Sequence, residues 1–278
     1  MRIDSHQHFW KYDPVRDSWI DDSMSVIKRD FLPVDLKPVL AKNNITGTVA
    51  VQADQSENET IFLLNLADEN PVIKAVVGWL DLKADDIDNK LKYYSKYDKL
   101  KGLRHIVQAE KKGFLEDKNF LRGISLLSKY NLTYDLLIYY NQFEELLSFV
   151  SKFPNQSFVL DHIGKPAIEK GHNSQEFEHW KKSIIKLADN PNVYCKVSGM
   201  VTETKFNQWV YDDFVPYLDV VTSAFGTERL MFGSDWPVCL LSGGYTKVLG
   251  IIEEYYKGFS NEEISRIMGK NAIDFYKI

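Results

Sequence analysis

Cysteine is scarce in this chain of 278 residues, which contains only Cys195 and Cys239. The two form no C-x-x-C pair and are too few for a disulfide framework, so the reducing cytoplasm fits best. No apolar run approaches the roughly 18 residues that a membrane-spanning helix needs. The first residues also lack the basic and then apolar pattern of a signal peptide. We therefore expect a cytoplasmic protein that has no membrane partner.

Basic clusters and flexible linkers are lacking as well. The net charge is −5 and the Lys and Arg residues are scattered, which argues against a nucleic-acid partner or a polybasic membrane anchor. No low-complexity or Pro/Gly/Ser-rich segment divides the chain, and hydrophobic residues make up 44% of it, enough for a sizeable core. We expect one domain that covers residues 1–278, a common size for a single α/β barrel.

What recurs along the chain is a short apolar run followed by a longer amphipathic stretch. The apolar runs are Ile3–Phe9, Thr46–Gln52, Lys74–Leu80, Lys101–Val107, Thr133–Tyr139, Phe158–His162, Val193–Val197 and Arg229–Gly233. Many are rich in Val, Ile, Leu and aromatic residues, as is typical of parallel strands that are buried on both faces.

Helical spacing of apolar residues appears between these runs, at Glu59–Glu69, Asn119–Tyr130 and Gln142–Phe153. A capping box, Ser260–Glu263, opens the last helix. Strand and helix alternating eight times predict an α/β fold of the closed (β/α)8 type, a TIM barrel. The segment Lys11–Pro33 fits neither pattern, and we expect a long loop there, after the first strand.

Polar and ionisable side chains stand at the end of nearly every apolar run, where a barrel places its active site. His6 and His8 share one face of the first strand because side chains alternate along a strand. With His162 and Asp235 they form a set that suits a single Zn²⁺-like ion. Without a metal, an ionised Asp235 can accept a proton from water while the histidines donate hydrogen bonds to a carbonyl oxygen. Both alternatives lead to attack of water on a carbonyl.

Each of these residues also has a purely structural interpretation. His162 alone is more often a core histidine with a backbone partner, and Asp235 could cap a helix. Arg104 and His105 are neighbours on one strand, so at most one of them points into the barrel mouth. Tryptophans such as those of this chain are more often packing residues than substrate platforms.

Seven short motifs occur in order from the first strand to the last helix. They are Asp4–Trp10 (DSHQHFW), Val77–Leu82 (VGWLDL), Gly102–His105 (GLRH), Leu160–Pro166 (LDHIGKP), Lys196–Gly199 (KVSG), Phe232–Pro237 (FGSDWP) and Gly269–Ala272 (GKNA). Together they resemble the amidohydrolase superfamily, and within it the sugar-lactonase branch of L-fuconolactonase, L-rhamnonolactonase and pyrone-dicarboxylate lactonase.

The resemblance implies a (β/α)8 barrel that opens the lactone ring of an aldonolactone of the L-fucono-, L-rhamnono- or galactonolactone type. It implies that Asp235 takes the proton of the attacking water and that the histidines polarise the carbonyl. If one divalent metal is bound, its ligands are His6, His8, His162 and Asp235; one metal and none remain equal alternatives. The implied substrate contacts are Arg104, His105, Gln52, Trp79, Tyr139, Trp10 and Trp236.

Two departures and two alternatives accompany this hypothesis. Binuclear members carry a bridging Lys or Glu on strand four and a histidine on strand five, whereas this chain offers Arg104-His105 and a fifth strand without histidine. A two-metal site is therefore not expected. The alternatives are a metal-dependent decarboxylase or other amidohydrolase acting on a small carboxylic acid, and a non-catalytic barrel that binds a carbohydrate acid. The lactone, its ring size and the loop shapes stay open, as does a homo-oligomer built on Tyr255 and Tyr256.

Overall fold

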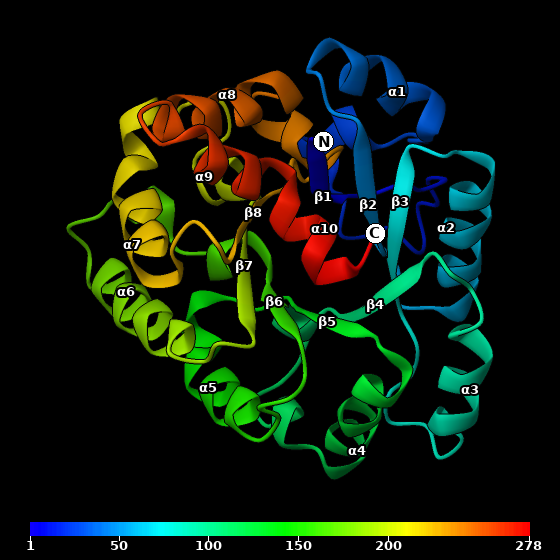
Figure 1. Ribbon diagram of the computed structural model, residues 1–278. Helices are drawn as coiled ribbons and strands as arrows, with labels where there is room; N and C mark the ends of the chain where they lie inside the picture. The colour runs from blue at the N-terminus through cyan, green and yellow to red at the C-terminus, as the bar shows by residue number, and fades with distance from the viewer.

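A barrel of parallel strands forms the centre of the computed structural model, which describes residues 1–278 (Figure 1). The strands are β1 (Ile3–Gln7), β2 (Gly47–Val51), β3 (Ile73–Gly78), β4 (Leu100–His105), β5 (Thr133–Leu136), β6 (Phe158–Leu160), β7 (Val193–Val197) and β8 (Leu230–Phe232). Each strand pairs with the next one along the chain. The predicted single (β/α)8 barrel is confirmed.

Main-chain hydrogen bonds join the first strand to the segment after the last. His8 N donates to Trp236 O over 2.7 Å, and Asp235 N donates to His6 O over 2.8 Å. Gln7 and Trp236 form a parallel bridge between these bonds. Because both segments lie at the carboxyl ends of their strands, the join brings the start and the end of the chain together on the face where barrel enzymes bind substrates.

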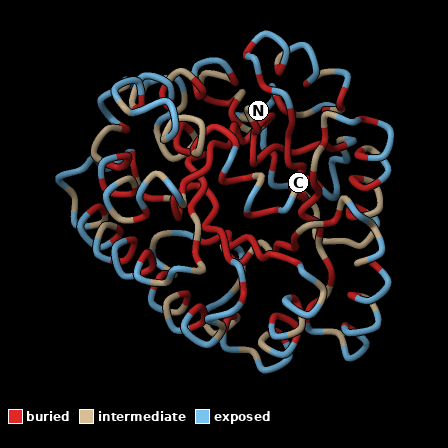
Figure 2. The backbone as a smooth tube through the Cα atoms, viewed as in Figure 1, coloured by how far each residue is buried: buried red, intermediate tan, exposed pale blue.

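Helices surround the strands (Figure 1), and the buried residues of the helices face the barrel, while their exposed residues lie on the outside (Figure 2). They are α1 (Pro33–Lys42), α2 (Glu57–Glu69), α3 (Ile87–Tyr94), α4 (Lys118–Leu127), α5 (Phe143–Ser151), α6 (Gln175–Ala188), α7 (Val215–Phe225), α8 (Tyr245–Tyr256), α9 (Asn261–Ser265) and α10 (Asn271–Tyr276). The capping box at Ser260 is confirmed, since its hydroxyl accepts a hydrogen bond from Glu263 N. No helix is long and apolar enough to cross a membrane.

Two segments complete the barrel at its opposite ends. The expected long loop after β1 contains a short 3-10 helix, Asp22–Ile27, and is tied back by a bridge between Trp10 and Phe31. The last helix, α10, packs its apolar residues against the first residues of the barrel and joins a second small core with Ile3 and Val49. The long loop therefore flanks the carboxyl ends of the strands, while α10 closes the amino ends.

Candidate active site

Three histidine rings and one carboxylate meet at the carboxyl end of the barrel. The Nε2 atoms of His6 and His8 lie 3.2 Å apart. Asp235 Oδ1 lies 3.3 Å from His8 Nε2, 3.8 Å from His6 Nε2 and 4.0 Å from His162 Nε2. All four side chains are buried, and their functional atoms converge although β1 and β8 are more than 220 residues apart in sequence.

Left-handed backbone conformations aim two of these side chains. His162 has a φ of 54°, its neighbour Ile163 a φ of 48°, and Asp235 a φ of 56°. Residues other than glycine rarely adopt this region, and each instance costs about 1–2 kcal/mol. The prediction of a sixth strand that runs through His162 is wrong: β6 ends at Leu160, and the left-handed turn rotates the imidazole into the barrel mouth.

Two glycines leave room for the histidines. A Cβ atom on Gly199, whose φ is +61°, would collide with the His162 ring. A Cβ atom on Gly233 would lie 2.7 Å from His6 Cβ, closer than real carbon contacts. Any larger residue at either position would displace an imidazole, which explains why the apolar runs of β7 and β8 are each followed closely by glycine.

The hydrogen bond of His8 fixes which ring nitrogen carries its proton. His8 Nδ1 lies 2.8 Å from the carbonyl oxygen of Val51. A carbonyl only accepts, so Nδ1 must be the donor, and a neutral His8 turns the lone pair of Nε2 toward Asp235. An acceptor nitrogen therefore faces a carboxylate oxygen, an arrangement that calls for a cation or a proton between them.

Burial sets the protonation of the other site groups. Burial lowers the pKa of His162 to about 4 and that of His6 well below its ordinary value, because the imidazolium form loses its hydration. Burial alone raises the pKa of Asp235, but the neighbouring imidazoles of His162, His8 and His6 outweigh burial and hold that pKa well below its usual range. At neutral pH His6 and His162 are thus neutral, and the Asp235 carboxylate beside them is ionised.

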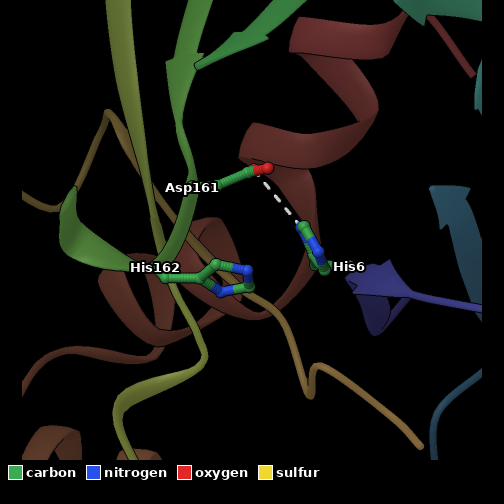
Figure 3. A group of neighbouring side chains, drawn as sticks. All are labelled: His6, Asp161 and His162. Atoms are coloured by element: carbon green, nitrogen blue, oxygen red, sulfur yellow. Dashed lines mark ion pairs between the residues drawn. The ribbon is translucent and has the colours of Figure 1, made fainter. Parts of the chain in front are cut away.

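A second layer of buried charges fixes the position of His6. His6 Nδ1 lies 3.3 Å from Asp161 Oδ1, and Figure 3 shows this pair beside the His162 ring. Lys196 Nζ lies 3.2 Å from the same His6 nitrogen and 3.0 Å from Asp161 Oδ1, and it also donates to Asp135. Arg104 Nη1 donates to Asp161 Oδ2 over 3.0 Å. The sequence alone had predicted no role for Asp161, Lys196 or Asp135.

Asp4 fastens the first strand to the turn that carries Asp235. Its carboxylate accepts hydrogen bonds from Ser234 N at 2.9 Å, the Ser234 hydroxyl at 2.6 Å and the Tyr245 hydroxyl at 3.0 Å. Burial raises the pKa of Asp4 to about 6, against the effect of these hydrogen bonds. The buried carboxylate thus holds β1 and the Asp235 turn in one register.

Comparison with known proteins agrees with this geometry. Residues 3–278 match the profile of the amidohydrolase family. The chain is 37% identical over 286 residues to L-fucono-1,5-lactonase from Burkholderia multivorans (strain ATCC 17616 / 249), covering 100% of this chain and 96% of that enzyme. It is 27% identical over 213 residues to L-rhamnono-gamma-lactonase from Scheffersomyces stipitis, covering 68% of this chain and 62% of that one. The chain belongs to the amidohydrolase family.

A solved amidohydrolase structure from Burkholderia multivorans, which contains bound zinc, matches this fold with a TM-score of 0.95 at 37% identity, covering 100% of this chain and 99% of that one. In the present amidohydrolase, His6 Nε2, His8 Nε2 and Asp235 Oδ1 are separated by 3.2, 3.3 and 3.8 Å. A tetrahedral Zn²⁺ with bonds of about 2.0–2.2 Å sets its ligands about 3.3–3.6 Å apart. The donor set therefore fits a divalent metal.

The predicted substrate residues of this amidohydrolase fall into two groups. Arg104 lies beside the histidines, with Nη1 3.3 Å from His6 Nε2, and Nη2 donates to the carbonyl of Gln52. The Gln52 amide donates back to Arg104 O over 3.2 Å, and its own side-chain oxygen is buried without a partner. Tyr139 lies at the rim, 40% exposed. These three residues border the mouth of the barrel.

The remaining four pack into neighbouring layers instead. His105 points away from the histidine cluster, as the strand alternation requires: it accepts a hydrogen bond from Trp79 Nε1 at 3.1 Å and stacks on Phe114. Trp10 and Trp236 are both 2% exposed and pack edge-to-face on Phe31 beneath the long loop. None of the four side chains pairs with the Asp235 carboxylate, and their rings stiffen the walls around the site.

Proposed function

We propose that this amidohydrolase opens the ring of a sugar lactone, of the type represented by L-fucono-1,5-lactone. The 37% identity over the whole chain to an L-fucono-1,5-lactonase supports this substrate class. The observation that carries the chemistry is the ionised Asp235 carboxylate held within 3.3–4.0 Å of three imidazole nitrogens in a buried mouth. Such a carboxylate can take a proton from water while its neighbours polarise a carbonyl.

In the proposed reaction, Asp235 removes a proton from a water molecule as the water oxygen attacks the lactone carbonyl carbon. The ring C–O bond then breaks, and Asp235 returns the proton to the departing ring oxygen, which becomes a hydroxyl. The product is the open aldonic acid. The low pKa of Asp235 keeps it ionised at neutral pH, ready to act as the base.

The histidines have distinct proposed roles. His162 Nδ1 lies 2.9 Å from the Ser198 hydroxyl; if Ser198 donates there, Nε2 carries the proton and can donate to the developing oxyanion. His8, with its proton on Nδ1, offers only a lone pair and suits a cation better than an oxyanion. A divalent metal held by His6, His8 and Asp235 would supply Lewis-acid polarisation of the carbonyl.

A screen of aldonolactones, with acid release followed at neutral pH, tests the proposal. We expect hydrolysis of a 1,5-lactone of a 6-deoxy sugar acid, and the same assays after chelation decide whether the metal is needed. Strict metal dependence without lactone hydrolysis would instead favour the decarboxylase alternative. Saturable binding of a sugar acid without turnover would favour the non-catalytic barrel.

Location and assembly stay predictions. Cys195 and Cys239 are buried free thiols, which supports the proposed cytoplasmic location. Tyr256 is buried and hydrogen-bonds Thr222, and Tyr255 hydrogen-bonds Asp219, so these aromatics serve helix packing. These contacts support helix packing as the role of the two tyrosines, and light scattering of the purified protein tests whether a homo-oligomer forms.

A further inference from the structure

A second set of polar side chains lies on the same rim of the barrel and has no role in the proposed reaction. Lys165 follows the turn that carries His162, Glu203 ends the short helix Met200–Glu203 after β7, and Tyr139 follows β5. The three therefore come from the carboxyl ends of three consecutive strands. They lie on the part of the rim that β5, β6 and β7 form.

The three side chains contact one another in a half-enclosed position. Lys165 Nζ lies 3.1 Å from Glu203 Oε1, and these side chains are only 16% and 15% exposed. The same ammonium lies 5.0 Å from the centre of the Tyr139 ring. Lys165 has a φ of 46°, so the left-handed turn that aims His162 also aims this lysine. Such conformations persist where the surrounding structure holds them, often at functional sites.

Electrostatics links the pair to the reacting groups. The charge of Lys165 contributes to lowering the pKa of His162, and the charge of Asp235 contributes to raising the pKa of Glu203, although burial is the larger cause in both cases. The ion pair of Lys165 and Glu203 is thus close enough to His162 and Asp235 to interact with them electrostatically. The pair is therefore within reach of the ring substituents of a lactone bound at Asp235.

The ion pair of Lys165 and Glu203 has hydrogen-bonding groups that no other side chain uses. An ammonium has three donors, of which Glu203 takes one, and Glu203 Oε2 has no hydrogen-bond partner in the structure. Two unused donors beside an unused acceptor match two adjacent hydroxyl groups, each of which can both accept and donate. The exposed face of Tyr139 can cover the C–H face of a sugar ring.

Charge pairing at the strand ends decides which ring fits. Lys165 pairs with Glu203, Arg104 pairs with Asp161 at 3.0 Å, and Lys196 pairs with Asp161 and Asp135. No largely buried cation at these strand ends is left over to bind a carboxylate. A lactone that carries an acid group would meet only neutralised cations and the ionised Asp235.

We propose that Lys165 and Glu203, with Tyr139 as a wall, form a subsite that recognises adjacent ring hydroxyls of a neutral sugar lactone and selects against carboxylated lactones. This inference rests on the proposed lactonase function and adds the part of the site that reads the substrate. Lys165 and Glu203 are specificity residues here, and the proton transfer belongs to Asp235.

Two variants test the subsite, each assayed on two substrates. Lys165→Met keeps the length of the side chain and removes its donors, and Glu203→Gln keeps the shape and removes the charge. For a polyhydroxylated 1,5-lactone we expect kcat/KM to fall about 10- to 100-fold, mainly through KM, because hydrogen bonds to charged groups are lost. For δ-valerolactone, the same ring without hydroxyls, we expect little change. Glu203→Gln, which frees the lysine, should also improve activity on a carboxylated lactone relative to the neutral one.

Lys170→Met is the matched control, because it removes an exposed lysine that pairs with Glu176 on the same segment after β6. It should leave both substrates unaffected. An equal loss on both substrates in the Lys165 and Glu203 variants, or no loss on either, would overturn the subsite and leave the lactonase proposal standing. A wild-type protein that hydrolyses no lactone would overturn both. If Lys165→Met does not fold, the isosteric Glu203→Gln carries the test alone.

Discussion

Replacing Asp235 by asparagine removes the proposed base and changes almost nothing else in shape. The carboxylate oxygen that the change replaces lies 3.3 Å from His8 Nε2 and 3.8 Å from His6 Nε2. The side-chain amide of asparagine can still hydrogen-bond to one of these lone pairs, so the local packing is kept. The amide cannot accept a proton from water at any pH in which the protein is folded.

The expected loss follows from the chemistry of general-base catalysis. A positioned base contributes about 10²- to 10⁴-fold, which corresponds to about 3–5 kcal/mol of transition-state stabilisation. Because the substrate ring contacts other residues, we expect kcat of Asp235→Asn to fall by this factor while KM changes less. The pKa of Asp235 lies below its ordinary value, so its charge contributes stability above the ordinary pKa of an aspartate. A modest loss of unfolding free energy at pH 7 is therefore also expected.

The assay is acid release from the lactone identified by the screen, with urea unfolding to show that the variant is folded. Asp85→Asn is the control for the loss of one negative charge. The Asp85 side chain is fully exposed, and its one ion pair is a surface contact of 3.6 Å between Asp85 Oδ1 and Arg122 Nη1. It should retain wild-type kcat. A folded Asp235→Asn protein with a kcat within tenfold of wild type would show that Asp235 is not the base.

Three further predictions follow from the buried groups. In the metal-free protein, the contribution of His162 to kcat/KM should stay level from about pH 8 to about pH 5.5 and fall in more acid solution, because the pKa of His162 is about 4; an acid limb centred near 6.5 that His162→Gln abolishes would contradict a neutral His162. Burial raises the pKa of Glu59 to about 7. The folded state is therefore favoured while Glu59 is protonated, and this contribution to the free energy of unfolding is lost as the pH rises through 7. Glu59→Gln should thus gain about 2–3 kcal/mol over wild type between pH 5 and 8 in urea unfolding, and a constant difference would refute this. Zinc at 100 times its Kd should raise the wild-type Tm by roughly 5 °C and that of His8→Ala hardly at all, and an equal shift in both would place the metal elsewhere.

The barrel could be predicted from the sequence because burial on both faces leaves a periodic apolar signal. The ends of the strands could not be predicted, because an apolar run indicates buried residues and does not show which of them form main-chain hydrogen bonds with a neighbouring strand. β5 ends at Leu136, although Leu137 and Ile138 continue the apolar run. These two residues are buried beyond the end of the strand.

The chemistry-bearing residues of the mouth were predictable for a topological reason. Parallel strands in a closed barrel bring their carboxyl ends together, so His6, His8, His162 and Asp235 had to meet if the barrel formed. The direction of a side chain that leaves the strand was not predictable. Trp10 and Trp236 follow strand ends just as the histidines do, yet their rings turn beneath the long loop.

Buried charges inside the strands bear on the proposed role of Asp235 as the base. Lys196 and Asp135 each interrupt an otherwise apolar run, and a charge at such a position must find a partner inside the barrel. The structure pairs them, and it pairs Arg104 with Asp161 in the next layer. The cations and anions of this layer balance, whereas Asp235 faces only imidazoles within ion-pair distance. Asp235 is therefore an ionised carboxylate without a permanent cation beside it, and it can receive either a metal ion or the proton of an attacking water. It has no such cation because Lys196 and Arg104 are already paired with Asp135 and Asp161 in the layer behind it.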